Sequence, residues 1–295
     1  MRLSAFAPAK INLFLHVGAP GADGYHPLCS LMVFADVGDR LALQDADVLS
    51  VRVHGAFADK LAGEGDNLVL RAARALLAQA RGPQPPVGIL LDKALPVAAG
   101  LGGGSSDAGA ALRLVRDALH LPLDEAALEE VAASLGADGA ACFRATPVLA
   151  QGRGERLSPA PALPPIEAVL VNPRVEVSTP AVYRAFDGAG AFGEVDPPPM
   201  PDAFESIEEL AAWLGFTRND LEAPAVGLAP QIGDVLETLR EERETLFARM
   251  SGSGATCFAL CPGDLEADAL AARISALRPD WWVVRCRLGG PWPDA

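Results

Sequence analysis

The sequence predicts an α+β fold divided into two domains, and three observations support this prediction. The chain has 295 residues, which is long for a single hydrophobic core. Strand-like and helix-like patterns are mixed along it, without the regular alternation of a doubly wound sheet. The proline-rich segment PAPALPP, residues 159–165, separates two structured regions. We therefore expect one domain over residues 1–158 and a second over residues 159–295.

Residues 9–17, AKINLFLHV, predict a strand because their side chains alternate between two faces. Ile11 and Leu15 would lie on one face, and Lys10 and Asn12 on the other. A loop rich in glycine and proline follows. Beyond it, the patterns predict strands at 30–37, 49–55 and 87–92, and a helix at 66–80 with Asp66 as its N-cap.

Helical spacing continues in the rest of the first domain. Apolar residues over 108–119 recur at helical intervals, and a further helix over about 123–135 would end at Gly136, a natural C-terminal cap position. The segment TPVLAQGRGERLSP, residues 146–159, predicts a hairpin.

Strands and helices are also mixed in the second domain. Residues 167–173 predict a strand, and SGSGA, residues 251–255, predicts a tight turn between two strands. Helices are expected at 178–187, 206–214, 230–242 and 264–277, and a last strand at 281–287.

The charge of the chain limits its partners. The formal net charge is −14 and the sequence pI is about 4.7. A field of this sign repels nucleic acid and anionic membranes, so neither is expected as a partner. An anionic small molecule remains possible if backbone amides and a few cationic side chains supply positive potential locally.

The five cysteines are scattered, odd in number and without a CxxC pair, so neither a disulfide framework nor a zinc site is expected. The four histidines show no metal-ligand spacing. This composition favours a reducing, cytoplasmic compartment, and no stretch approaches the length of a transmembrane helix.

The most informative segment is LPVAAGLGGGSSDAGAAL, residues 95–112. Glycine weakens helices and strands, so the glycines clustered within residues 100–104 need a specific reason. Three familiar motifs fail here. A Walker A loop would need a lysine, the dinucleotide fingerprint would need a glycine in place of Ser105, and a nucleophile elbow would need a glycine two residues after the serine.

The physical basis of phosphate binding nevertheless applies to this segment. Glycines let backbone N–H groups turn inward and approach a ligand, and Ser105 or Ser106 could cap a helix whose N-terminus attracts anions. Asp107 would repel a phosphate, so it must turn away, cap the first turn or act through Mg²⁺. The glycines that would turn their N–H groups towards an anion are Gly100, Gly102, Gly103 and Gly104.

This segment and several others together resemble the GHMP kinase superfamily. The phosphate loop of that family reads P-x-x-x-G-L-G-S/G-S-S/A, which is similar to residues 96–106. The resemblance implies that the phosphates of ATP are bound by Pro96, Val97, Ala98, Ala99, Gly100, Leu101, Gly102, Gly103, Gly104, Ser105 and Ser106. The resemblance covers the chain from about Ala7 to Leu260, and DGYH with PAKIN is its most specific part. The other matching segments are PAKINLFLHV (8–17), DGYHPL (23–28), NDLEAPA (219–225) and SGSGATCFAL (251–260).

The resemblance implies a two-domain GHMP kinase fold, with a ribosomal-protein-S5-like N-terminal domain and a ferredoxin-like C-terminal domain. ATP, with Mg²⁺, and the substrate would meet in the cleft between them. The implied activity is phosphoryl transfer from ATP to the 2-hydroxyl of a cytidine-diphosphate-linked methylerythritol, in the non-mevalonate route to isoprenoids.

The resemblance also implies that Lys10 and Asp138 are catalytic. Asp138 would take the hydroxyl proton, and Lys10 would keep that carboxylate ionised and offset charge on the phosphoryl oxygens. Taken alone, they would be interpreted as a surface lysine on a strand and a solvated loop aspartate. Gly139 and Ala140 stand where the family has Val-Pro, which would loosen the segment around Asp138.

The same resemblance places Asn12, Tyr25 and His26 in the substrate site. Tyr25 would hold the cytidine by ring contact, His26 by hydrogen bonds to the base, and Asn12 by a polar contact. The helix that begins at Asp66 and Asn67 would lie near the adenosine. The turn over 251–254 would lie against the phosphate loop. The ligands of Mg²⁺ and the oligomeric state stay unassigned.

Three alternatives remain open. Another GHMP kinase, acting on homoserine, mevalonate or a sugar, would share the loop but not DGYH. A non-catalytic nucleotide-binding protein would use the cleft as a sensor and would not need both Lys10 and Asp138. A flavin or nicotinamide oxidoreductase is disfavoured by the missing third glycine.

Overall fold

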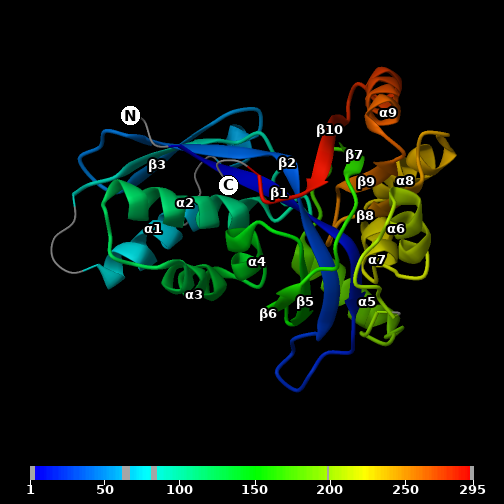
Figure 1. The fold of residues 1–295 in the computed structure, drawn as a ribbon, viewed down its shortest axis with the longest axis horizontal. Helices are drawn as coiled ribbons and strands as arrows, with labels where there is room; N and C mark the ends of the chain where they lie inside the picture. Colours follow the sequence, from blue (N-terminus) through cyan, green and yellow to red (C-terminus); the bar gives the residue numbers. More distant parts are fainter. Residues whose placement is uncertain (1–3, 62–66, 81–84, 198, 293–295) are drawn as a thin grey trace.

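The computed structural model describes residues 4–61, 67–80, 85–197 and 199–292. Within them, ten strands form one sheet whose main path runs β3-β4-β2-β10-β7-β9-β8. Helices pack on this sheet in two lobes, one for each half of the chain, which confirms the α+β class (Figure 1). The strands are β1 (Ser4–Val17), β2 (Leu28–Gln44), β3 (Ser50–His54), β4 (Gly88–Asp92), β5 (Val148–Gly152), β6 (Arg156–Pro159), β7 (Ile166–Asn172), β8 (Phe247–Met250), β9 (Cys257–Cys261) and β10 (Trp282–Gly289). The helices are α1 (Leu68–Gln79), α2 (Gly103–Ala118), α3 (Glu125–Leu135), α4 (Gly139–Arg144), α5 (Thr179–Ala189), α6 (Ile207–Leu214), α7 (Glu222–Leu228), α8 (Gln231–Glu241) and α9 (Asp264–Leu277), with a 3-10 turn at Ala58–Leu61.

The long strand β2 joins the two lobes. One of its edges pairs with β1 along most of its length. The other edge pairs in turn with β5 at residues 28–32, with β10 at residues 34–35 and with β4 at residues 40–44. The strand β10 therefore connects the sheet of the second lobe to that of the first. We propose to keep the domain boundary between residues 158 and 159, at the end of β6.

The second lobe has a ferredoxin-like arrangement, as the resemblance implies. Its strands lie antiparallel in the order β10-β7-β9-β8, which is 4-1-3-2 in chain order. Helices α5 to α8 connect β7 to β8, and α9 connects β9 to β10. This is a β-α-β-β-α-β pattern with extra helices in its first connection. Ile232 of α8 and Leu270 of α9 are buried in one cluster with Val169 and Val171 of β7.

In the first lobe, α1 and α2 pack together on the sheet. Leu112 and Val115 of α2 share a buried cluster with Leu76 of α1 and Leu91 of β4. Figure 1 shows these two helices and α3 on the same face of the sheet. This packing fixes the axis of α2, whose first turn carries the end of the glycine-rich segment.

The N-cap of α1 differs from the prediction. Asn67 precedes this helix, and its Oδ1 accepts a hydrogen bond from Val69 N at 2.8 Å. Asp66, the predicted cap, lies outside the described residues. The cap is an Asx side chain in either case, but it stands one residue later than expected.

Strand β1 departs from its predicted alternation. Its pairing with β2 shifts by one residue between Asn12 and Phe14, which marks a β-bulge. The two faces exchange at the bulge, so Leu15 lines the same cavity as Lys10 and Asn12. The prediction that Leu15 lies opposite these two residues is therefore wrong.

The other predicted elements are present with small shifts at their ends, except that β2 continues to Gln44 instead of ending at residue 37. Helices α4 and α7 are not predicted by the sequence, because segments of six and seven residues carry too little periodicity. Across the described ranges, we find no helix with the length and apolarity needed to cross a membrane.

Candidate active site

A cavity of about 880 Å³ is lined by residues of both lobes. The first lobe contributes β1, the loop before α2 and the segment that leads into α4. The second lobe contributes α5 and the turn after β8. The predicted site residues that line this cavity are Lys10, Asn12, Tyr25, His26, Asp138 and every residue from Pro96 to Ser105. Ser106 lies one residue further along α2, is buried and has no hydrogen-bond partner for its Oγ among the described residues.

The glycine-rich loop lines the cavity and leads into the start of α2. Gly100 and Gly102 have left-handed φ values of 75° and 61°, a conformation that costs glycine no strain. Gly102 is the N-cap of α2, and the first hydrogen bond of the helix runs from Ser106 N to Gly102 O at 2.9 Å. The N–H groups of residues 103–105 precede that bond, so they have no carbonyl partner within the helix. Such a helix start attracts anionic groups.

Neither Ser105 nor Ser106 caps this helix, which corrects the prediction. The left-handed Gly102 starts α2 at Gly103, so both serines already belong to its first turn. The cap position is occupied by a glycine without a side chain. The amide donors of the first turn therefore stay available to a ligand.

The turn after β8 supports the loop. Ser251 Oγ donates to Gly100 O at 2.9 Å, and Thr256 N donates to Ala99 O at 3.1 Å. Lys10 N donates to Leu101 O at 2.8 Å. Both the turn and β1 thus hold the loop through its carbonyls. The expected contact between the 251–254 turn and the loop is confirmed.

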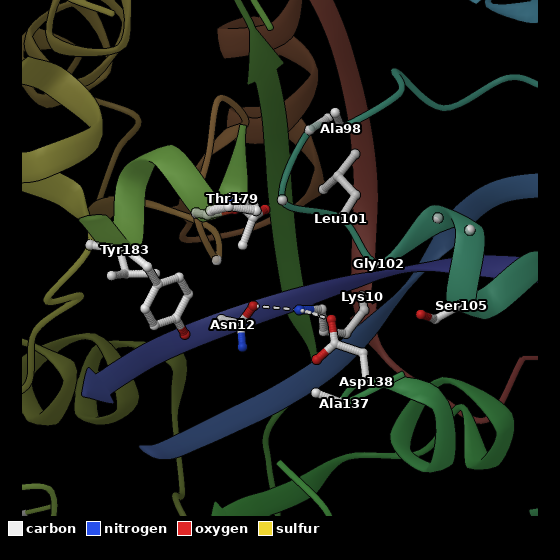
Figure 2. A pocket seen from close by; sticks show the side chains of 18 of the residues that line it. Lys10, Asn12, Ala98, Leu101, Gly102, Ser105, Ala137, Asp138, Thr179 and Tyr183 are labelled. Atoms are coloured by element: carbon white, nitrogen blue, oxygen red, sulfur yellow. Dashed lines mark hydrogen bonds and ion pairs between the residues drawn. The ribbon is translucent and has the colours of Figure 1, made fainter. Parts of the chain in front are cut away.

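Lys10, Asn12 and Asp138 form a connected polar group in the cavity (Figure 2). Lys10 Nζ donates to Asn12 Oδ1 at 2.7 Å and lies 3.0 Å from Asp138 Oδ2. Asn12 Nδ2 donates in turn to Ser30 Oγ at 2.7 Å, which fixes the amide. Lys10 is 4% exposed, whereas the side chain of Asp138 is 32% exposed. The lysine is therefore a buried positive charge, and the carboxylate is the member of the pair that a ligand can reach.

Asp138 is positioned by the packing of α3 against α4. It directly precedes Gly139, the first residue of α4, and its side chain turns to Lys10 instead of capping that helix. A Cβ on Gly139 would lie 1.9 Å from Ala132 O of α3, so this close approach requires a glycine. Gly139 and Ala140 are both buried within α4. The expectation that they loosen the segment stays a prediction.

Aromatic side chains gather at the part of the cavity lined by Tyr25 and His26. The His26 ring is held on both sides, with Nδ1 at 2.8 Å from Gly18 O and Nε2 at 3.2 Å from Asp187 Oδ1. Tyr183 of α5 faces this ring, with the two ring centroids 5.1 Å apart. Burial, reinforced by the Asp138 carboxylate, raises the pKa of Tyr183 to about 12, so its hydroxyl remains a hydrogen-bond donor.

A buried charge cluster anchors both ends of the glycine-rich loop. Lys93 Nζ lies 2.5 Å from Asp39 Oδ2 and 2.7 Å from Asp107 Oδ2. Asp39 Oδ1 accepts hydrogen bonds from Ala94 N and Leu95 N at 2.7 and 2.9 Å. The cluster thus ties the entry of the loop to the first turns of α2 and to β2. The carboxylate of Asp107 pairs with Lys93, and no side chain among the described residues caps α2, so the role considered for Asp107 as a cap is wrong.

The ionisation of this cluster follows from its burial. Lys93, Asp39 and Asp107 are 3%, 0% and 2% exposed. Burial opposes the charge on Lys93, but the two carboxylates outweigh it and raise the pKa of the ammonium. Burial also raises the pKa of Asp107 to about 8, against the effect of Lys93 and with that of Asp39. The Lys93 ammonium thus lies between the buried carboxyl groups of Asp39 and Asp107.

Several cavity residues are not predicted by the sequence. Side chains of α5 reach the cavity from the second lobe. The sequence of this helix carries no recognisable motif, so only the tertiary fold reveals their position. Thr179 Oγ1 and Ser253 Oγ, for example, are 2.7 Å apart across two elements. The additional polar residues of the cavity are Lys93, Arg153, Thr179, Tyr183, Arg184 and Asp187.

The carboxylates of the cavity do not form a ready-made metal cage. In the part of the chain that the structure describes, no three His, Cys, Asp or Glu side chains are arranged to hold a metal ion. Asp138 is paired with Lys10, and Asp107 with Lys93. Mg²⁺ is commonly held by one or two carboxylates together with substrate phosphates. These residues therefore fit a metal that arrives with a nucleotide.

Comparisons with known proteins agree with this geometry. The family described as "GHMP kinases N terminal domain" matches residues 67–145, and that described as "GHMP kinases C terminal" matches residues 201–279. The 4-diphosphocytidyl-2-C-methyl-D-erythritol kinase of Caulobacter sp. (strain K31) is 66% identical over 293 residues, which are 99% of this chain and 100% of that protein. The protein of the same name from Hyphomonas neptunium (strain ATCC 15444) is 49% identical over 97% of each chain.

Solved structures show the same fold. A 4-(cytidine 5'-diphospho)-2C-methyl-D-erythritol kinase matches with a TM-score of 0.79 and 36% identity, over 98% of this chain and 100% of its own. A homoserine kinase from Cytophaga hutchinsonii ATCC 33406 matches with a TM-score of 0.67 and 18% identity, over 98% and 94% of the two chains. At that identity the likeness concerns the fold alone.

Proposed function

The chain belongs to the GHMP kinases and, among them, to the 4-diphosphocytidyl-2-C-methyl-D-erythritol kinases, and from this premise we propose how its own residues carry out the reaction. It is an ATP-dependent phosphotransferase that acts on a small molecule. The acceptor we propose is 4-diphosphocytidyl-2-C-methyl-D-erythritol, phosphorylated at its 2-hydroxyl in the non-mevalonate route to isopentenyl diphosphate. The Lys10–Asp138 pair, 3.0 Å apart in the cavity that the glycine-rich loop lines, carries this proposal.

The donor nucleotide lies along the glycine-rich loop. The free amides of residues 103–105 and the left-handed glycines receive the β- and γ-phosphates of ATP. The same cavity extends to Leu61, Asn67 and Leu68, which we assign to the adenosine. The apolar side chains of Leu61 and Leu68 suit a planar base. Asn67 is the N-cap of α1 in the same part of the cavity.

We expect Gly100→Ala to weaken ATP binding by about tenfold or more. A Cβ at this position would lie 2.2 Å from Ser251 O on a left-handed backbone. That backbone alone costs an ordinary residue about 1–2 kcal/mol, and 1.4 kcal/mol corresponds to tenfold in affinity. Titration calorimetry measures the loss. Gly136→Ala is the matched control, because its backbone is extended and no atom lies within 4 Å of its Cβ. Equal losses in both variants would contradict the role of loop geometry.

The acceptor lies on the other side of the Lys10–Asp138 pair. Figure 2 shows the pair between Tyr183 of α5 and Ser105 of α2. We place the cytosine against Tyr25, His26 and Tyr183. A base that hydrogen-bonds to His26 Nε2 would replace Asp187, whose side chain is 41% exposed. The methylerythritol would then extend toward Asn12 and the catalytic pair.

In the transfer step, the 2-hydroxyl oxygen bonds to the γ-phosphorus as the bond to the β,γ-bridging oxygen breaks, and ADP leaves. Asp138 orients the hydroxyl and accepts its proton late, because phosphoryl transfer passes through a loose transition state. Lys10 holds its ammonium 3.0 Å from this carboxylate and offers its positive charge to the phosphoryl oxygens. Asn12 fixes the position of Lys10 through the 2.7 Å hydrogen bond.

Mg²⁺ is part of this proposal as a partner of ATP. The residues that face the phosphates and could contact it are Asp138 and the first turn of α2. When bound, it would neutralise charge on the phosphate oxygens. No ligand set is assigned to it.

The experiment that tests this function is a panel of acceptors assayed for ADP formation. We expect rapid, acceptor-dependent ADP release with 4-diphosphocytidyl-2-C-methyl-D-erythritol and very little with homoserine, mevalonate or galactose. Faster turnover of one of the other three would assign a different substrate. ATP binding without turnover of any acceptor would indicate a nucleotide sensor.

We also propose that the protein works in the cytoplasm without nucleic-acid or membrane partners. The net charge of −14 disfavours anionic surfaces. The five cysteines are buried free thiols, which suits a reducing compartment.

A further inference from the structure

Arg153 lies in the turn of the β5–β6 hairpin and lines the cavity beside Tyr25. Its guanidinium carbon is 4.3 Å from the centroid of the Tyr25 ring, which is within the range of cation–π attraction. The same guanidinium forms an ion pair with Asp23. These contacts of Arg153 belong neither to the glycine-rich loop nor to the Lys10–Asp138 pair.

Asp23 connects the guanidinium back to the main chain of Tyr25. Its Oδ1 accepts a hydrogen bond from Tyr25 N at 3.0 Å, while its Oδ2 contacts Arg153 Nη2. Gly21 N also donates to Tyr25 O at 2.8 Å. The Tyr25 backbone, the Asp23 carboxylate, the guanidinium and the phenol ring therefore form a closed set of contacts. This set ties the loop that carries Tyr25 to a separate hairpin.

The hairpin turn holds Arg153 in place. Gly152 and Gly154 have positive φ values of 74° and 110°, and Gly154 N donates to Gln151 O at 3.1 Å. Arg153 N donates to Glu155 Oε2 at 2.5 Å. The backbone at position 153 is thus constrained on both sides, with its side chain at the cavity.

Tyr25 has little other restraint on its ring. The residue is 59% exposed, so burial contributes little to its orientation. The guanidinium covers one face of the ring, and Tyr25 lines the cavity. A ring held in this way can offer one flat face to a ligand.

We propose that Arg153 is a positioning residue for the acceptor, which holds the Tyr25 ring so that a planar base can stack on its open face. The inference rests on the proposed function, since the base concerned is the cytosine of the acceptor. Arg153 acts through Tyr25 and Asp23 and does not itself contact the reacting atoms.

Arg153→Met should raise the KM for the acceptor about two- to fivefold, as expected for the loss of an exposed cation–π contact. The kcat and the KM for ATP should stay unchanged, because the ring supports binding equally in the ground and transition states. Arg153→Lys keeps a cation over the ring and should restore part of the affinity. Arg156→Met is the matched control, since Arg156 is exposed on the same hairpin and does not line the cavity.

A double-mutant cycle tests whether Arg153 acts through Tyr25. In a Tyr25→Leu background, Arg153→Met should change the acceptor KM no further. Additive losses would overturn the inference, because the guanidinium would then act on the substrate directly. An unchanged KM in Arg153→Met alone would overturn it as well.

Calorimetric titration with cytidine 5'-diphosphate reads the same effect without turnover. Weaker binding to Arg153→Met than to the wild type and to Arg156→Met supports the inference, and equal binding to all three contradicts it. The proposed function is tested separately, because its failure would be the absence of wild-type turnover with the acceptor.

Discussion

Asp138→Asn is expected to lower kcat by about 10²- to 10⁴-fold, which is the usual contribution of a positioned general base. The asparagine has nearly the same shape, but it cannot accept the hydroxyl proton. ATP affinity should be retained or slightly increased. Lys10, 3.0 Å from the substituted group, would then direct its full positive charge toward the phosphates. Steady-state kinetics and calorimetry with ATP on the same preparation measure the two effects.

Asp187→Asn is the matched control for this substitution. Asp187 is another carboxylate that lines the cavity, but it contacts His26 instead of Lys10. Its replacement should change the KM for the acceptor with little change in kcat. A wild-type kcat in Asp138→Asn would show that another group takes the proton.

Lys93→Met is expected to destabilise the fold by about 3–5 kcal/mol, as breaking a buried ion pair typically does. Asp39 and Asp107 would then lie 0% and 2% exposed without their cation. The methionine fills a similar volume, so the loss reflects charge and not a cavity. Urea unfolding measures the change in the free energy of unfolding. ATP affinity should fall in parallel, because the cluster anchors both ends of the glycine-rich loop that we propose binds the phosphates.

The chain offers its own control for this effect. Lys60 forms an ion pair with Glu176 in which both side chains are at least 60% exposed. Lys60→Met should therefore change stability by no more than about 1 kcal/mol. Adding Asp107→Asn to Lys93→Met removes one buried acid and should recover part of the loss. A Lys93→Met variant as stable as Lys60→Met would contradict the proposed role of the cluster.

The cluster also predicts the pH dependence of stability. The folded pKa of Asp107, about 8, lies above its unfolded value of about 4. The folded state keeps a proton that the unfolded state releases in this interval. The contribution of Asp107 to stability is therefore full below about pH 4 and is lost as the pH rises to about 8. Asp107→Asn should remove this decline from the unfolding curves.

The sequence predicts the position of the glycine-rich loop well, because this loop and the helix after it are local in the chain. The glycines and the following helix are contiguous, and these residues line one cavity. The start of α2 is mispredicted, since the pattern of serines suggests a side-chain cap. The left-handed Gly102 takes that role instead. The hydrophobic periodicity of a sequence does not reveal a left-handed backbone conformation such as that of Gly102.

The part of the cavity around His26 is harder to predict from the sequence. Tyr183 and Asp187 reach the cavity from the second lobe, and only the docking of the two lobes brings them to His26. The bulge in β1 that turns Leu15 into the cavity arises from pairing with β2. Lys93 is one of three lysines in the chain, but its two partners are distant in sequence. Contacts between separate elements, which no local pattern encodes, decide all of these positions.

The affinity of the protein for a series of adenine nucleotides tests the central claim most directly. That claim is that main-chain amides at the start of α2 bind the triphosphate of ATP. Calorimetric titration at constant ionic strength, with Mg²⁺ present, should show AMP binding about a hundredfold or more weaker than ATP. Two charged hydrogen bonds of about 1.5–3 kcal/mol each would account for that ratio. Equal affinities for ATP and AMP would contradict the account, because the nucleotide would then be held by its adenosine alone.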